Sequence, residues 1–156
     1  MDPPPESQYN QWACSLACYV WCMKRRGVTN LIQEDFVRTN SHLFLEWNST
    51  NPNRREGLLS HGQICDLMLS NQALRCRKFV HTNSTTDFHD YLNRNYSGYV
   101  AGFVLTRQPT NHCLAIVSWD GLGVSVMNPD DQGSFQSVSW VDFESNFDAD
   151  FLAFFR

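Results

Sequence analysis

The sequence predicts an α+β fold, in which a helical N-terminal half packs on a C-terminal twisted antiparallel β-sheet. Apolar residues recur mostly with helical spacing in the first half, whereas from Gly98 onward they lie in short runs rich in β-branched and aromatic residues. Short turns such as Asp120-Gly-Leu-Gly123 separate these runs and favour antiparallel neighbours. The 156 residues have the length of one ordinary domain, so residues 1–156 are predicted to form a single domain.

The first half opens with a proline-led segment, residues 1–7, whose composition suggests a flexible lead-in. A first helix is predicted at about Ala13 to Arg26, because basic residues at its end complement the helix dipole before Gly27 stops it. The elements expected after it are a helix over 29–40 capped by Thr29 or Asn30, an irregular stretch over 43–57, a helix over 60–71 capped by Ser60, a strand over 74–81 and a helix over 86–93.

The second half is predicted to form the sheet. Its strands are expected at 98–106, 113–119, 124–127, 135–140 and 151–155, with a brief helix over 141–146. Runs of strands after runs of helices are typical of α+β domains.

Charge and cysteine usage exclude several classes of function. Lys and Arg number 12 against 16 Asp and Glu, and the basic residues are scattered apart from clusters at 24–26 and 75–78, so we expect no nucleic-acid partner. The six cysteines form no C-x-x-C pair, which argues against a zinc site, and we expect neither a metal nor a cofactor.

The N-terminus has neither the basic nor the apolar part of a secretory signal, and the longest apolar run, Trp12 to Met23, is too short to span a bilayer. We therefore expect reduced thiols in a protein that is cytoplasmic or exported by a specialised secretion system.

The stretch from Gln8 to Gly27 contains the best candidate nucleophile. Cys14 lies where an approach loop becomes helix, and the unpaired N–H groups and dipole of a helix N-terminus favour thiolate over thiol. The alternative is that Cys14, Cys18 and Cys22 are three buried residues on one helical face, since free cysteines are commonly buried.

A second candidate group lies in the sheet half. His112 opens one strand and Asn128 ends the next, and a hairpin brings these two ends together. An amide at Asn128 can bind one imidazole nitrogen and fix the ring, while the other nitrogen faces a thiol. Asp130 or Asp131 could replace Asn128 in that position, and His112 and Asn128 could each be an ordinary strand-edge or turn residue.

Taken together, Gln8-x5-Cys14-x2-Ala17, Asn111-His112 and Asn128-Pro129 resemble the papain-like cysteine peptidase superfamily. The resemblance is nearest to the bacteriocin-processing (double-glycine) peptidases and to effector cysteine proteases of plant pathogens. The sequence differs from the bacteriocin-processing branch in having Ser15 after the cysteine and Asn-Pro instead of Asp-Pro at the third position.

The resemblance implies a papain-like fold and a role for each residue. Cys14 would be the nucleophile, His112 the general base and then acid, and Asn128 the group that orients His112. Gln8 would donate its side-chain N–H to an oxyanion hole shared with the backbone N–H of Cys14, and Gln11 is the alternative for that position.

The implied function is a thiol-dependent amide hydrolase, namely a papain-like cysteine protease of bacterial effector, toxin or processing type. Its partners would be a protein or peptide substrate and a cognate inhibitor or immunity protein. A glutamine deamidase or transglutaminase-type toxin, or a cell-wall amidase, could use the same site. A non-catalytic binding module would make the pattern a coincidence.

Overall fold

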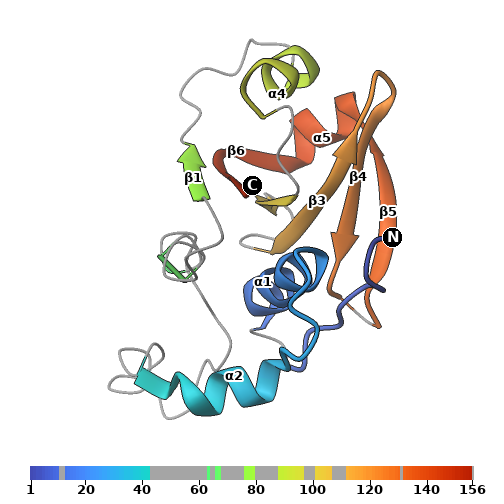
Figure 1. Ribbon diagram of the computed structural model, residues 1–156. Coiled ribbons are helices and arrows are strands. Elements are labelled where there is room, and N and C mark those ends of the chain that lie inside the picture. The colour runs from blue at the N-terminus through green and yellow to red at the C-terminus, as the bar shows by residue number, and fades with distance from the viewer. Residues whose placement is uncertain are drawn as a thin grey trace.

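A computed structural model describes residues 1–10, 13–42, 63, 66–67, 76–79, 88–96, 101–106, 112–130 and 132–155. It confirms the predicted α+β fold class (Figure 1). The helices are α1 (Cys14–Arg25), α2 (Gln33–Thr39), α4 (Phe88–Tyr96) and α5 (Trp140–Asn146). The strands are β1 (Cys76–Phe79), β2 (Ala101–Thr106), β3 (Cys113–Trp119), β4 (Gly123–Asn128), β5 (Ser134–Ser139) and β6 (Phe147–Phe155).

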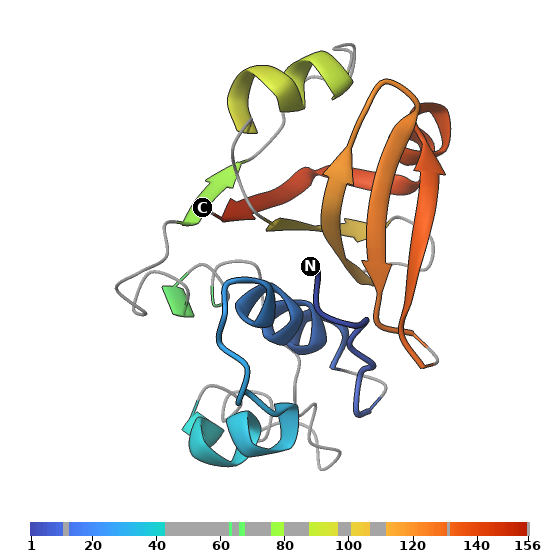
Figure 2. The same ribbon diagram turned by 45° about the vertical axis from the view of Figure 1, so that its right-hand side comes forward.

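The strands form one six-stranded sheet in the order β1-β6-β2-β3-β4-β5, and all of its neighbouring pairs are antiparallel. Figure 2 shows β3, β4 and β5 side by side and β6 running from α5 toward β1. The β3–β4 turn is closed by Asp120, whose carboxylate accepts hydrogen bonds from the backbone N–H groups of Leu122 and Gly123 at 2.7 and 3.1 Å. This hairpin is the part of the sheet that positions the candidate site.

Helix α1 is the centre of the core. It is buried from Cys14 to Met23, because the apolar and small residues of this run continue around the whole helix until the basic residues of its last turn. One buried cluster joins it to Cys113 and Ala115 of β3 and to Met127 of β4. Ala115 and Met127 face each other in the β3–β4 register, so α1 packs on this face of the sheet.

The opposite face of the sheet is also covered. Ile116 and Val126 are paired across β3 and β4, are buried, and point away from α1 because side chains alternate along a strand. Helix α5 contacts β4, β5 and β6 and contributes the buried Phe143, and α4 contacts α5. The hairpin that carries the candidate site is thus held between two helical layers.

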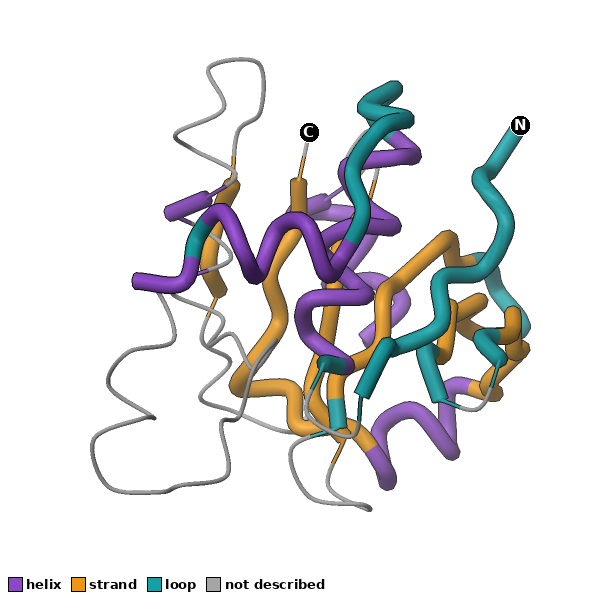
Figure 3. The backbone as a smooth tube through the Cα atoms, turned by 90° about the horizontal axis from the view of Figure 1, so that it is seen from below, coloured by secondary structure: helices purple, strands orange, loops and turns teal. Residues whose placement is uncertain are grey.

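The N-terminal segment, residues 1–10, makes specific contacts, although the sequence suggests a flexible lead-in for residues 1–7. In Figure 3 it is the teal tube that leads from the N-terminus past the strands. Trp21 of α1 donates its indole N–H to the carbonyl of Pro3 at 3.3 Å, and Arg25 pairs with Asp2 at 2.8 Å. The β4–β5 loop approaches the segment so closely that a Cβ at Gly133 would lie 3.0 Å from the backbone of Glu6.

Several predicted boundaries differ from the structure. The second helix begins at Gln33, not near Thr29, and its N-cap position is Ile32, which makes no side-chain capping hydrogen bond. The last strand begins at Phe147 instead of Phe151. The predicted irregular stretch over 43–57 lies outside the described residues, and of the predicted helix over 60–71 only residues 63, 66 and 67 are described, all helical.

Two features are absent from the described part of the chain. None of its helices combines the length and hydrophobicity that crossing a bilayer requires. Within the same residues, no group of three or more His, Cys, Asp or Glu side chains is arranged to hold a metal ion.

Candidate active site

Cys14 is the first residue of α1 and lies beside the sheet. The preceding N-cap residue, Ala13, supplies no side-chain hydrogen bond, and the first turn contains no acidic residue. The positive dipole end of α1 therefore favours a negative charge at this position. The residue is 7% exposed, in contrast to the fully buried Cys18, Cys22 and Cys113.

The other cysteines of the described core have a structural role. Burial raises the pKa of the Cys18 thiol, and the neighbouring Cys113 raises it further. Cys18 donates its S–H to the backbone carbonyl of Cys113 at 3.4 Å, which ties α1 to β3. Burial also raises the pKa of Cys22 far above its ordinary value. Both thiols stay protonated at neutral pH, and Cys113 is fully buried, which leaves Cys14 as the candidate nucleophile among these four residues.

His112 precedes β3 directly, and the β3–β4 hairpin places it beside the turn that follows β4. Its Nε2 lies 2.9 Å from Oδ1 of Asn128 and 3.3 Å from Oδ2 of Asp130. The same Oδ1 of Asn128 accepts the backbone N–H of Asp130 at 3.0 Å, so the amide is fixed by its own turn. Asn128 and Asp130 therefore contact the same ring nitrogen, and Asp131, the third partner that the sequence offers, lies outside the described residues.

The other side of the imidazole ring faces the thiol. His112 and Cys14 form a side-chain hydrogen bond. Because Nε2 is engaged by Asn128 and Asp130, Nδ1 is the ring nitrogen left for Cys14. The structure thus brings Cys14, His112 and Asn128 into one chain of contacts from α1 to the end of β4.

The surroundings of His112 set its protonation. Burial acts to lower its pKa, but the hydrogen bonds with Cys14 and Asn128 and the negative charges at Cys14 and Asp130 act in the opposite direction. The net result is a pKa above the ordinary value of 6.5. The imidazolium form is therefore favoured next to the thiol.

Gln8 reaches the site through its backbone. Its N–H donates to the carbonyl of Pro129 at 2.9 Å, so Gln8 is attached to the turn that also presents Asn128 and Asp130. Its side-chain Oε1 is buried and has no hydrogen-bond partner among the described residues. Gln11, the alternative oxyanion residue, lies outside the described residues.

His89 lies outside this group and makes contacts with other residues. His89 on α4 lies 3.1 Å from the amide nitrogen of Asn93 and stacks on Trp140, with ring centroids 5.3 Å apart. It contributes to the packing of α4 against α5.

The arrangement contains the groups that thiol-based acyl transfer requires. A cysteine at a helix N-terminus contacts an imidazole, and a third side chain orients that imidazole from behind. The side-chain amide of Gln8 and the backbone N–H groups at the start of α1 are donors of the kind that stabilise an oxyanion.

Comparison with known proteins supports the fold. A solved structure described as a double glycine motif protease from an AMS/PCAT transporter, in complex with the leader peptide, is similar to this chain with a TM-score of 0.62. The match covers 97% of this chain and 89% of that chain at 12% sequence identity. No protein-family model matches the sequence, and no curated protein matches it significantly. The likeness at this low identity is one of fold, namely the α+β fold that this chain shares with that protease.

Proposed function

We propose that this protein is a papain-like cysteine peptidase that hydrolyses amide bonds of a protein or peptide substrate. The observation that carries the proposal is the position of His112, which bonds Cys14 on one side and Asn128 on the other. The fold likeness to a protease in complex with a leader peptide supports a peptide as substrate.

Each residue has a defined task in the proposed reaction. The Cys14 thiolate attacks the amide carbon, and the resulting oxyanion is stabilised by the Gln8 side-chain N–H and the Cys14 backbone N–H. The His112 imidazolium gives its proton to the leaving amine as the C–N bond breaks, which leaves a thioester. Water then attacks this thioester while His112 accepts a proton, and the Cys14 thiolate leaves.

The contacts of His112 explain why the charged pair would form before substrate arrives. Asn128 fixes the ring without adding charge, whereas the Asp130 carboxylate also favours the imidazolium. The raised pKa of His112 increases the share of the imidazolium form, which carries the proton that the leaving group needs.

The test is digestion of a complex peptide mixture, with mass spectrometry of the products. We expect the wild-type protein to create new peptide ends and Cys14→Ala or His112→Ala to reduce their rate of formation by more than about 1,000-fold. Cys22→Ala is the matched control, because Cys22 is on the same helix and fully buried, and this variant should remain active.

Labelling with iodoacetamide supplies a second readout that needs no substrate. In the folded protein Cys14 should react faster than Cys18, Cys22 and Cys113, and His112→Ala should slow its reaction at pH 6 to 7. New peptide ends that persist in Cys14→Ala would overturn the proposal. A thiol-dependent mass gain of about one dalton on glutamine residues, without backbone cleavage, would replace it with deamidation.

A further inference from the structure

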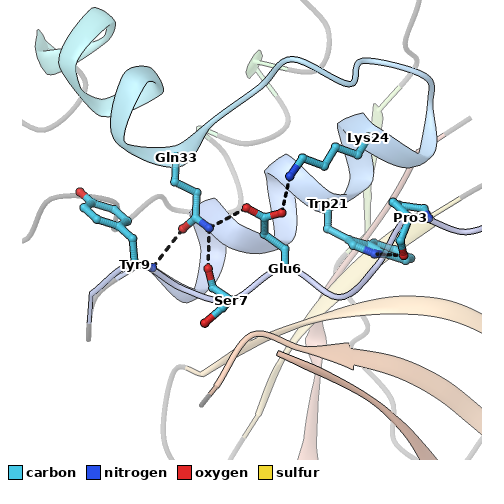
Figure 4. Close-up of polar contacts among 7 residues, drawn as sticks. All are labelled: Pro3, Glu6, Ser7, Tyr9, Trp21, Lys24 and Gln33. Carbon is cyan, nitrogen blue, oxygen red and sulfur yellow. Dashed lines mark hydrogen bonds and ion pairs between the residues drawn. The ribbon is translucent and has the colours of Figure 1, made fainter. Parts of the chain in front are cut away.

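Gln33 is a buried polar residue with an unusual set of contacts. It is the first residue of α2, and it is only 4% exposed. Burying an amide is costly unless its donors and acceptor are paired. Among the described residues, its side-chain partners lie in the N-terminal segment of residues 1–10, far from α2 in sequence (Figure 4).

These partners flank Gln8 on both sides. The Gln33 Nε2 donates to the carbonyl of Ser7 at 2.6 Å, and its Oε1 accepts the backbone N–H of Tyr9 at 3.3 Å. Gln8 itself donates its N–H to the carbonyl of Pro129 at 2.9 Å. Three successive residues of the backbone are therefore held between α2 and the turn after β4.

The orientation of the Gln33 amide is itself fixed. Its Nε2 also donates to Oε1 of Glu6 at 2.9 Å, and the other carboxylate oxygen of Glu6 lies 2.5 Å from Nζ of Lys24 on α1. The Glu6 and Lys24 side chains are largely buried, with 15% and 26% exposure. Figure 4 shows this network joining α1, α2 and the N-terminal segment.

The side chain of Gln8 depends on these backbone anchors. Its Oε1 makes no hydrogen bond within the described residues, so that oxygen does not hold the amide in place. An oxyanion donor is effective only when it is already aimed at the position of the developing charge. A shift of the backbone at Gln8 would therefore change the direction in which its side-chain donor points.

We propose that Gln33 is a positioning residue for the oxyanion hole, acting through the backbone on either side of Gln8. This inference rests on the proposed peptidase function, because it assigns Gln33 a role in the same reaction. It predicts that Gln33 affects the acyl-transfer step and leaves the Cys14–His112 pair intact.

The kinetic test uses Gln33→Met, which keeps the length of the side chain but removes its donors and acceptor. The substrate is a fluorogenic peptide that carries the sequence cut most often by the wild-type protein in the peptide mixture. We expect kcat to fall by about 10-fold to 100-fold with little change in KM, because misplacing a catalytic group mainly affects the transition state. The matched control is Arg38→Met, which removes an exposed ion pair with Asp35 on the same helix and should leave kcat unchanged.

Alkylation of Cys14 by iodoacetamide separates positioning from general damage to the fold. This reaction needs the thiolate but forms no tetrahedral oxyanion, so Gln33→Met should be alkylated at Cys14 as fast as the wild-type protein. The fraction of Cys14 that is alkylated also gives the concentration of folded active sites, by which kcat is normalised. A parallel loss of alkylation and kcat would overturn the inference, because Gln33 would then serve stability alone.

A double-mutant cycle tests whether Gln33 acts through Gln8. If it does, Gln8→Ala combined with Gln33→Met should be about as slow as Gln8→Ala alone, whereas independent effects would multiply. Multiplying effects, or a kcat unchanged by Gln33→Met, would overturn the inference while the peptidase remains. A wild-type protein that cleaves no peptide would instead overturn the proposed function, and this inference with it.

Gln33→Glu provides a rescue by pH. Its carboxylate would face the Glu6 carboxylate and the Ser7 carbonyl, so we expect a loss of kcat near neutral pH. When protonated it regains one donor and one acceptor. The ratio of its kcat to that of the wild-type protein should therefore rise as the pH falls, and a constant ratio would contradict the role of the amide.

Discussion

At the scale of single residues, His112 contacts two side chains through one ring nitrogen, and these side chains differ in charge. Asn128 lies at 2.9 Å and is held by the N–H of Asp130, whereas the Asp130 carboxylate lies at 3.3 Å with 45% of its side chain exposed. We therefore propose that Asn128 orients the ring and that Asp130 adds a partly screened charge.

This difference predicts an order of effects on activity. We expect Asn128→Ala to lower kcat more than Asp130→Ala, because only the first removes the close and well-held contact to Nε2. Orienting groups of this kind contribute on the order of 10-fold to 10,000-fold to turnover. The measurement is kcat of both variants on one peptide, and a larger loss in Asp130→Ala would show that the carboxylate is the orienting group.

The titration of His112 gives a second prediction. Its pKa should exceed 6.5 in the folded wild-type protein, and it should fall in both Cys14→Ala and Asn128→Ala, because each removes a contact that raises it while burial still lowers it. NMR of the imidazole Cε1–H against pH measures the midpoint. A midpoint that does not move in Cys14→Ala would mean that the thiol does not contact the ring in solution.

Sequence reasoning could find the residues of the site whose chemistry is visible locally. Cys14 stands at a helix start, and His112 and Asn128 stand at the two ends of one hairpin. Local sequence patterns for helix starts and hairpins therefore predict these positions. Gln33 carries no such signal. Its partners lie more than twenty residues earlier in the chain, and a glutamine in the first turn of a helix is an ordinary surface residue until the tertiary structure buries it.

At the scale of elements, the β4–β5 pair contains a close approach that only glycine allows. A Cβ at Gly123 would lie 2.1 Å from the carbonyl oxygen of Val138 on the neighbouring strand, whereas nothing lies within 4 Å of a Cβ at Gly121. We expect Gly123→Ala to lower the free energy of unfolding by about 1 to 3 kcal/mol, as overpacking typically does.

Gly121→Ala is the control for this prediction, since it adds the same methyl group to the same hairpin in open space. Its effect should stay within about 0.5 kcal/mol. Urea unfolding followed by tryptophan fluorescence measures both variants. Equal stability of the two would mean that β5 can move away from β4 without cost.

The two elements with wrongly predicted boundaries, α2 and β6, show that local sequence patterns do not determine where every element begins. Leu31 and Ile32 have helical spacing with Phe36, yet Ile32 is extended and 54% exposed. The preceding Gly27 has a φ of +96°, and Val28 donates its N–H back to Met23, so the chain leaves α1 in an extended connection before α2 begins. The early start of β6 has a similar cause, because Asp148 is drawn into the sheet by its pairing with Leu105 of β2.

At the scale of the whole molecule, His112 couples stability to pH. Its folded-state pKa lies above the ordinary value of 6.5, so its contribution to stability is full below that value and is lost as the pH rises through the folded pKa. The difference in free energy of unfolding between the wild-type protein and His112→Ala should therefore shrink as the pH rises from about 6 to 9. Denaturant midpoints across this range measure it, and a difference that grows with pH would contradict the raised pKa.

The fold class followed from the change of hydrophobic period near Gly98, because that pattern reflects which side chains face a core. The order of the strands in the sheet could not be predicted from this pattern. The β3–β4–β5 meander is local, but β6 lies between β1 and β2, and such distant pairing is set by the burial of the finished sheet. Turns and periodicity contain no information about it.

The position of β6 also affects the order in which the sheet can assemble during synthesis. On the ribosome, α1 emerges first and displays Cys14, while His112 and Asn128 are still to be synthesised. The strand that joins β1 to β2 is the last of the described elements to appear, so β1 must wait for it without its partner in the sheet. A nascent chain therefore carries its thiol long before the histidine that would activate it, and the β1–β6–β2 part of the sheet can form only after β6 has been synthesised.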